Sequence, residues 1–473
     1  MRTAILFTMC AGMFLVQLDV TVVNVALPTL GGELRANVPQ LQWVVAGYSV
    51  VLAALLLTGG ALGDVLGHRV VVLTGLGVFG AASAACGLAR SAGWLVAARA
   101  VQGAGAALVL PGTMAVIAGT FPGRAERARV LGVWAGISAL ALPAGPLLGG
   151  ILVQTAGWRP VFWLNVPIVA AAAVATRRLV PPDVRKRGRV DVPGAATAAL
   201  ALGSGVYAVI AKTPWAGLLA VAAAVAFVVV ERRAPAPMLP LPLLRSRQTA
   251  GANLVSAAMN FVGLGSVLVF TLYSQDVLDA DPIAAAAAVL PMFVPMVLLG
   301  PVSGRLTARF GSRPQIVAGL LLGVAAMLNL LRIGPGTGYW TLLPTLLVLS
   351  AGMGLLTAAV VTAAVADAPG ERAGIAGGFN NAARQAGGAL GVAVFGAVAG
   401  EPAAHASFVH GLHLLGLGSA GLWLAAAVLA VVTVHGRGRA KASCGDRLTW
   451  SQQGVDPAIT GEPPEEPGGR RPQ

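Results

Sequence analysis

Two ionisable side chains lie inside long apolar runs of this sequence. Asp19 belongs to a run that begins near residue 4, and Arg99 follows Trp94 in another run. An ionised carboxylate at the centre of a membrane helix costs about 2.5–3.5 kcal/mol on insertion scales, so it must face a cavity, a partner or a proton. Asp19 is therefore a candidate proton-binding group. The alternative is a structural, hydrogen-bonding acid at a helix contact.

The depths of the two side chains predict that they meet. At 1.5 Å per residue, Asp19 lies about 22 Å from one boundary of a hydrocarbon core about 30 Å thick, and Arg99 lies about 8 Å from the other boundary. We expect Arg99 to keep Asp19 ionised until a conformational change separates them, and a permanent structural ion pair is the alternative. Gln102 lies three residues after Arg99 on the same helix face, where it could complete a polar cluster.

The composition places these side chains in a membrane protein. The chain has 473 residues, of which 56% are hydrophobic and 11% charged, and its mean hydropathy is +0.79. A soluble domain carries about 25% charged residues, and one water-facing core cannot hide this much apolar surface. Only helices and closed barrels satisfy their backbone groups in lipid, and the apolar blocks are continuous runs of about 20 residues. The sequence predicts an all-α polytopic protein of the lipid bilayer.

Hydropathy windows of about 19 residues predict fourteen spans. They lie at residues 4–30, 43–63, 70–89, 94–120, 130–154, 161–176, 193–211, 215–230, 250–274, 283–304, 316–331, 340–366, 375–400 and 412–434.

The distribution of basic residues predicts the orientation of these spans. With the N-terminus inside, 25 of the 32 basic residues fall in cytoplasmic segments, five fall in outer loops, and Arg99 and Arg384 lie within spans. The positive-inside rule therefore predicts that both termini are cytoplasmic in a multi-pass protein of the cell membrane. Membrane orientation also explains the net charge of +14, so no nucleic-acid partner is expected.

Other binding chemistries find little support in the sequence. His405, His410 and His413 are expected in the last outer loop, where Glu401 is the sole acid near them, so no metal site is expected. A Gly-Lys-Ser or Gly-Lys-Thr phosphate loop is absent from the sequence, and no acid, His or Cys constellation inside the spans suggests an enzyme. Residues 435–473 are rich in Pro, Gly, Arg and Glu, which predicts a disordered cytoplasmic tail.

A short internal repeat divides the chain into two halves. Four residues recur 244 positions later at the same topological place, between the second and third spans of a six-helix unit. They are Gly60, Leu62, Gly67 and Arg69, and then Gly304, Leu306, Gly311 and Arg313. We predict a six-helix bundle at 1–180, an inserted helix pair with basic linkers at 181–247, and a second six-helix bundle at 248–434. Such parallel repeats place the substrate between the halves.

Five longer motifs occur in chain order. They are LDVTVVNVALP at 18–28, GALGDVLGHR at 60–69, RAVQGAGAA at 99–107, GPLLGG at 145–150 and WRPVFWLNVP at 158–167. Together they resemble the major facilitator superfamily, specifically its 14-span drug:proton antiporter family, over nearly the whole chain outside the tail. The sequence departs from the family pattern at Val65, at His68, at Ala141 and, in the second copy of the loop motif, at Ala308.

The resemblance implies gating roles for two motifs. Asp64 lies at the membrane edge beside basic residues and is expected to latch the cytoplasmic side, together with Gly67 and Arg69. The counterpart of Asp64 in the family meets the start of a helix of the other half, which the positive helix N-terminus favours.

The fifth span carries the antiporter motif and is expected to be a moving element. Its small residues let neighbouring backbones approach, and its prolines remove backbone donors, although packing alone is the alternative reading. The residues concerned are Gly132, Gly136, Pro143, Gly145, Pro146, Gly149 and Gly150.

The resemblance implies proton-driven export of amphipathic small molecules such as antibiotics, by alternating access of two halves. The proton gradient supplies the energy, no cofactor is needed, and a monomer is expected. Candidate substrate-binding residues between the halves are Asn24, Asn260, Asn380 and Arg384. A single buried acid predicts neutral, monocationic or weakly anionic cargo. The alternatives are a symporter or facilitator of a small metabolite with the same fold, and a substrate-binding sensor that transports nothing.

Overall fold

A computed structural model of the full chain describes residues 1–121, 123–182, 190–235, 237–239, 241–334, 336–368, 373–402 and 404–435. The predicted tail therefore lies, apart from residue 435, outside the described residues. Over the described ranges, 14 helical segments are long and apolar enough to cross a membrane. The number agrees with the hydropathy prediction, and the regular elements of these ranges are helices.

The first half of the chain forms seven helices, because its sixth span is divided in two. They are α1 (Arg2–Leu34), α2 (Val38–Leu66), α3 (His68–Gly87), α4 (Ala92–Thr120), α5 (Arg124–Ala156), α6 (Arg159–Trp163) and α7 (Asn165–Leu179).

The remaining elements continue in chain order through the inserted pair and the second half. They are α8 (Val192–Ile210), α9 (Pro214–Arg233), the 3₁₀ segment η1 (Leu241–Arg245), α10 (Arg247–Leu272), the π-helical segment η2 (Tyr273–Val277), α11 (Pro282–Val289), the 3₁₀ segment η3 (Leu290–Met292), α12 (Val294–Phe310), α13 (Ser312–Asn329), the 3₁₀ segment η4 (Leu330–Arg332), α14 (Tyr339–Val365), α15 (Ala373–Ala399) and α16 (His405–Thr433).

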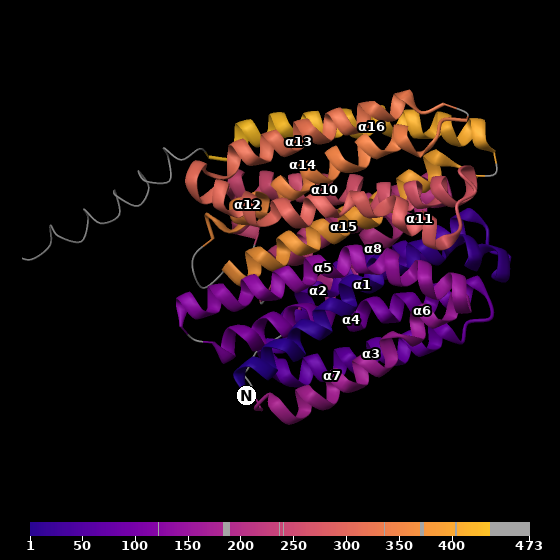
Figure 1. The fold of residues 1–473 in the computed structure, drawn as a ribbon. Coiled ribbons are helices and arrows are strands. Elements are labelled where there is room, and N and C mark those ends of the chain that lie inside the picture. The colour runs from indigo at the N-terminus through magenta and orange to yellow at the C-terminus, as the bar shows by residue number, and fades with distance from the viewer. Residues whose placement is uncertain are drawn as a thin grey trace, which may run out of the picture.

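The helices run side by side in two groups (Figure 1). Helices α1 to α7 form one group and α10 to α16 the other, and the two meet where α2 packs along α15 and where α5 packs on α11. The pair α8 and α9 packs on α2 and α15 through α8, so it contacts one helix of each half. The domain boundaries at residues 180, 247 and 434 stay predictions.

The two halves contain equivalent turns at the repeated glycines. Gly67 joins α2 to α3 with φ 95°, and Gly311 joins α12 to α13 with φ 88°. In each turn the glycine N–H donates to the carbonyl four residues earlier, that of Gly63 or that of Thr307. Because a positive φ strains residues that carry a Cβ, these two turns explain why glycine stands at both positions.

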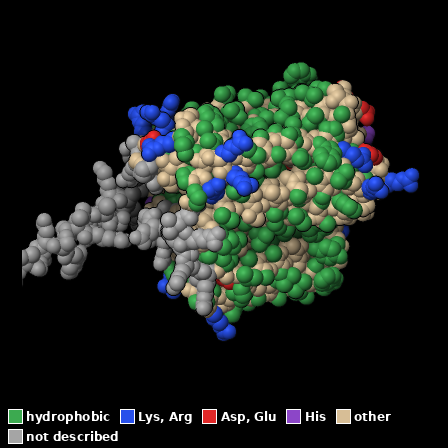
Figure 2. Space-filling view, turned by 90° about the horizontal axis from the view of Figure 1, so that it is seen from below, with side chains coloured by type: hydrophobic (Ala, Val, Ile, Leu, Met, Phe, Trp, Pro, Cys, Tyr) green, Lys and Arg blue, Asp and Glu red, His purple; other side chains and the backbone are tan. Residues whose placement is uncertain are grey.

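Apolar side chains cover most of the face seen in Figure 2, and Lys and Arg gather mainly toward the two ends of the molecule, with a smaller group between them. Helix α9 exposes large apolar side chains most clearly, because Leu218 is 73% exposed and Val221 is 64% exposed. Water would penalise such contiguous apolar exposure, whereas lipid would not.

One predicted span contains a break, and one predicted boundary is wrong. The span predicted at 283–304 lies within the candidate span Pro282–Phe310, but its helix is interrupted, as α11, η3 and α12, because Pro291 and Pro295 remove backbone donors. The three histidines were expected in a loop, but α16 begins at His405 and includes all of them. Histidine lowers window hydropathy without breaking a helix, so hydropathy placed this start seven residues too late.

The glycines of α5 divide into two kinds. A Cβ at Gly145 would lie 2.0 Å from Thr21 Oγ1 and 2.9 Å from Thr21 Cβ, and one at Gly149 would lie 2.9 Å from the carbonyl oxygen of Val22, so both glycines allow α5 to approach α1. At Gly132 and Gly136 a Cβ would find nothing within 4 Å among the described neighbours, so the expected close approach there is wrong.

This contrast predicts the stability of two matched variants. Gly136→Ala should be neutral or stabilising, because alanine raises helix propensity by up to about 1 kcal/mol. Gly145→Ala should lower the unfolding free energy by about 1–3 kcal/mol, since the added methyl overpacks the contact with α1. Thermal unfolding of the two purified variants measures the difference, and equal midpoints would contradict the packing account.

Candidate functional site

Asp19 lies on α1 at the centre of a polar cluster inside the first bundle. Its Oδ2 accepts a hydrogen bond from Arg99 Nη1, with which it forms an ion pair. Its Oδ1 accepts one from Gln102 Nε2 at 2.9 Å and one from Asn165 Nδ2 at 3.1 Å. Asp19 is 0% exposed and Arg99 is 1% exposed. The carboxylate therefore has three donors and a countercharge, which is what an ionised acid needs away from water.

Arg99 is held from several directions. On α4, its Nη1 also donates to Gln102 Oε1 at 2.8 Å, one helical turn further along. Its Nε donates to the carbonyl of Val44 on α2 at 3.1 Å, and its Cζ lies 4.3 Å from the centre of the Tyr48 ring. The aromatic face adds an attraction for the cation. The guanidinium is thus fixed by α1, α2 and its own helix.

Asn165 belongs to this cluster, although sequence reasoning gave it no role. Its Nδ2 bridges Asp19 Oδ1 and Ser83 Oγ, each at 3.1 Å, and Ser83 Oγ donates to the carbonyl of Phe162 at 2.8 Å. Asn165 starts α7, where Leu164 separates it from α6. Its place in the motif at 158–167 was visible in the sequence, but hydropathy alone does not give the direction of a side chain.

The first bundle encloses the cluster entirely, because its members come from α1, α2, α3, α4 and α7. Asp19, Gln102 and Asn165 are each 0% exposed, so the pair is closed in this conformation. A proton would reach Asp19 only after the donors around it move apart. Two roles were predicted for Asp19 and Arg99, a proton-carrying pair and a permanent structural ion pair. Both roles require the contact between these two side chains that is seen here.

The α1 residues that follow Asp19 link the cluster to the boundary between the halves. Thr21 and Val22 are the residues that Gly145 and Gly149 of α5 approach. One residue later on α5, a Cβ at Gly150 would lie 2.8 Å from the Pro282 carbonyl oxygen of α11. Helix α5 is therefore packed on α1 on one side and on the second half on another.

Further contacts between the halves lie at the same end of α1 and α5. Gln275 Nε2 of η2 donates to the carbonyl of Val25 at 3.1 Å, and the Ile283 amide of α11 donates to Gln154 Oε1 at 3.3 Å. This is the end farther from Met1, since α1 begins at Arg2 and ends at Leu34.

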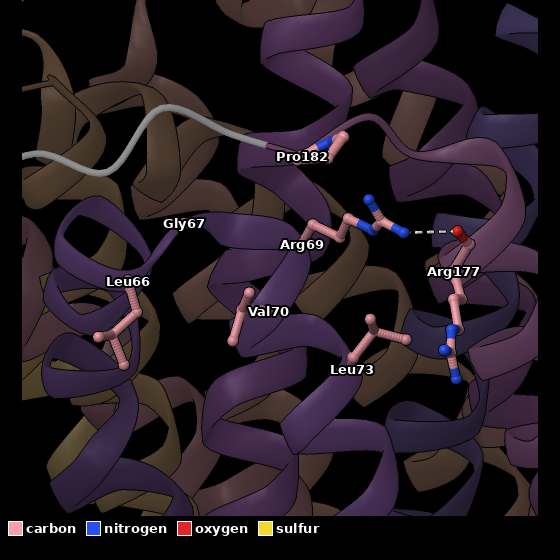
Figure 3. A pocket seen from close by; sticks show the side chains of 7 residues that line it. All are labelled: Leu66, Gly67, Arg69, Val70, Leu73, Arg177 and Pro182. Atoms are coloured by element: carbon pink, nitrogen blue, oxygen red, sulfur yellow. Dashed lines mark hydrogen bonds between the residues drawn. The ribbon is translucent and has the colours of Figure 1, made fainter.

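The predicted latch residues lie at the other end of the molecule. Arg69 Nη2 donates to the carbonyl of Arg177 on α7 at 2.6 Å, and Gly67 and Arg69 line a small pocket of about 230 Å³ (Figure 3). Asp64 is 65% exposed at its side chain, and its Oδ1 lies 3.5 Å from Nε2 of His68, one helical turn along the chain. The role of Asp64 as a cytoplasmic latch stays a prediction.

The four candidate substrate residues do not form one group. Asn24 Nδ2 donates to the carbonyl of Val20 at 3.0 Å, whereas Asn380 Nδ2 donates to Asn253 Oδ1 at 3.2 Å and to Ser256 Oγ at 2.7 Å. Asn380 is thus occupied in joining α15 to α10.

Within the described ranges, the side chains of the other two candidates make no hydrogen bond. Asn260 is 8% exposed and lies one turn after Ser256 on α10. Arg384 lies on α15, one turn after Asn380, and its Nε is buried without a hydrogen-bond partner.

A cavity of about 550 Å³ lies between the two halves, at the end farther from Met1, and none of the four candidate substrate residues lines it. Side chains of α1 and α2 line one wall, and residues from α10 to the start of α16 line the other. Among the lining residues are Leu27, Gln42, Leu268, Asp276, Glu401 and His405. No local motif marks this cavity, because its walls come from segments far apart in the sequence.

Two groups of six spans, equivalent glycine turns and an extra helix pair define a transporter-type helical membrane fold. Residues 9–392 match the family model of the Major Facilitator Superfamily. The chain belongs to this superfamily. A solved peptide transporter POT in complex with sulfate has the same fold, with a TM-score of 0.69 and 16% identity over 91% of this chain and 94% of that one.

Relatives of higher identity are drug-resistance proteins. The chain is 38% identical to the methylenomycin A resistance protein of Streptomyces coelicolor, over 82% of this chain and 84% of that protein. It is 35% identical to the tetracenomycin C resistance and export protein of Streptomyces glaucescens, over 83% and 74%. It is 34% identical to the puromycin resistance protein of Streptomyces alboniger, over 91% of each. The chain is therefore a transporter related to antibiotic-resistance exporters.

The buried pair predicts strong coupling in a double-mutant cycle. Asp19→Leu and Arg99→Met should each lower the unfolding free energy by about 3–5 kcal/mol, because each leaves one buried charge without its counter-ion. The double variant removes both charges and should be less destabilised than either single variant. Thermal unfolding of the purified proteins measures this, and additive losses would contradict a buried pair of charges.

Proposed function

We propose that this chain exports amphipathic small molecules in exchange for protons, with Asp19 as the proton-binding group. The observation that carries the proposal is the buried cluster: Asp19 is satisfied as an ionised acid only while Arg99, Gln102 and Asn165 surround it. A conformational change that moves these donors away leaves a carboxylate in an apolar interior. Such a carboxylate gains stability by binding a proton.

The packing of α5 supports a route from this cluster to alternating access. Gly145 and Gly149 let α5 follow α1 near Asp19, and Gly150 seats α5 on α11 of the other half. A shift of α1 when Asp19 binds a proton would therefore change the packing of α5 on α11 at the boundary between the halves. Asp64, Gly67, Arg69 and Pro146 serve as gating elements in this proposal, and Asn24 and Asn260 remain candidates for cargo contact.

The orientation completes the proposal. Both termini and the basic loops face the cytoplasm, as the positive-inside count predicts, and the protein acts as a monomer in the cell membrane. The bundles at 1–180 and 248–434 rotate relative to each other around the bound cargo. The helix pair α8 and α9, within 181–247, remains packed on α2 and α15. A membrane potential adds about 2.3 kcal/mol per charge per 100 mV to the driving force on the protons.

Inverted membrane vesicles test this function with three naphthalene probes of fixed charge. They are 2-naphthalenesulfonate, 2-naphthalenesulfonamide and trimethyl(2-naphthyl)ammonium. We expect vesicles with the wild-type chain to accumulate at least one probe when a proton gradient is present. An uncoupler should abolish the accumulation, and Asp19→Asn should reduce it to the level of empty vesicles.

The matched control is Asp279→Asn, the same acid-to-amide change in an exposed turn where φ is 51°. Asparagine accepts this left-handed backbone readily, so accumulation should stay at the wild-type level. Accumulation that survives the uncoupler, or that survives Asp19→Asn, would overturn the proton role. A lack of accumulation for all three probes would count against export of amphipathic molecules of this size.

A further inference from the structure

The interior of the two halves differs in charge balance. Each half has one arginine deep within a span, Arg99 in the first and Arg384 in the second. Arg99 has Asp19 as its counter-ion. Across the described ranges, Arg384 makes no ion pair and no hydrogen bond, and its Nε is buried without a partner. The second half therefore has one positive charge that nothing in the described structure balances.

Arg384 is too deep in the span to be explained by its position at a helix end. It lies 11 residues after the first residue of α15, or about 16 Å along the helix axis. Arginines near helix ends place their charge at the membrane interface, whereas charged groups at this depth face a partner or a water-accessible space. The residue as a whole is only partly buried, although its Nε is buried.

Two sides of α15 are closed by neighbouring helices, one by the backbone of α10 and the other by a side chain of α2. Toward α10, a Cβ at Gly387 would lie 2.1 Å from the Ala257 carbonyl oxygen, and one at Gly391 would lie 2.0 Å from the Phe261 carbonyl oxygen. Toward α2, a Cβ at Gly396 would meet Gln42 Nε2 at 2.1 Å. Lipid cannot reach these two sides.

The sector that holds Arg384 lies between these two contacts. An α-helix has 3.6 residues per turn, so Arg384 and Asn381 project from α15 between its α10 side and its α2 side. Leu390 projects from the opposite flank and approaches Gly205 of α8. Further along this flank, Leu264 of α10 closes the space at Gly388. Leu264 also packs against two core clusters, one made of residues of both halves and one made of residues of the first half, so the flank of Arg384 faces the boundary between the halves.

We propose that Arg384 is the countercharge for the cargo, and that the cargo is an amphipathic organic monoanion such as a carboxylate, a sulfonate or an enolate. This deepens the proposed function and rests on it. A planar guanidinium offers paired donors that match the two oxygens of such an anion. One unbalanced positive charge calls for one negative charge, and a cationic cargo would meet repulsion at this point.

The surroundings favour an organic anion over a small inorganic one. Chloride and phosphate are strongly hydrated and would need several donors to replace their water, whereas Asn380 already donates to Asn253 and Ser256. An amphipathic anion loses little hydration on its apolar part and gains from burial there. The unbalanced positive charge of Arg384 thus narrows the cargo from any amphipathic molecule to one with a single negative charge.

Equilibrium binding to the purified full chain tests the proposal independently of transport. The probes are again 2-naphthalenesulfonate, 2-naphthalenesulfonamide and trimethyl(2-naphthyl)ammonium, which share a ring system and differ in charge. We expect the wild type to bind the sulfonate at least tenfold more tightly than the other two, because a hydrogen bond to a charged group is stronger than a neutral one. Chloride and phosphate at the same concentration should not displace it.

Three variants identify the residue responsible. Arg384→Gln should remove the tenfold preference, whereas Arg384→Lys should keep part of it because the charge remains. Arg332→Gln, the same change in η4 at an exposed position, should bind like the wild type. Thermal unfolding of each variant confirms that it is folded.

The outcomes separate this inference from the proposed function. Equal affinity for the three probes, failure of the wild type to bind the sulfonate, or a preference that survives Arg384→Gln would overturn the anion site. Proton-driven accumulation of the ammonium or sulfonamide probe in vesicles, without the sulfonate, would overturn it as well and would leave the exporter proposal standing. Selective binding of the sulfonate without proton-driven accumulation of any probe would support the anion site and contradict export.

Discussion

The first bundle is organised around one requirement, that a carboxylate without access to water keeps its charge. Asp19 meets it with a counter-ion and three hydrogen bonds, supplied by Arg99, Gln102 and Asn165. The donors come from two helices, so the relative register of α1, α4 and α7 is fixed by chemistry as well as by packing. A slide of any one of them by a turn would leave a buried charge unpaired, which costs several kcal/mol.

Helix α5 is held in a different way. Its contact with α1 consists of glycine against side chain and backbone at Gly145 and Gly149, and its contact with α11 is glycine against backbone at Gly150. Contacts of this kind fit closely but carry no charge and no obligatory hydrogen bond. They can be broken and remade at lower cost than the cluster around Asp19. The bundle thus combines a charge-paired polar centre with a close, uncharged contact to α11 of the second half.

Much of this arrangement could be predicted from the sequence, because lipid imposes simple rules on length and charge. The depth of Asp19 and Arg99 in their spans followed from the rise per residue alone. The role of Asn165 did not, since it depends on how α7 is rotated and on the break at Leu164. Small-residue spacing was informative at Gly145 and failed at Gly132, because the spacing is the same whether or not another helix lies opposite.

The comparison of the two halves carries the reasoning about cargo one step further. Repeats of this kind share a fold, so a difference in their interiors reflects a difference in what each interior does. The first half contains a charge and its counter-ion, and it can change its net charge only by exchanging a proton. The second half contains Arg384, which makes no ion pair among the described residues, and in the proposed anion site its charge is balanced by a negative group of the cargo. In this proposal, proton handling and cargo recognition belong to different bundles, and the glycine contacts of α5 with α1 and α11 link the two.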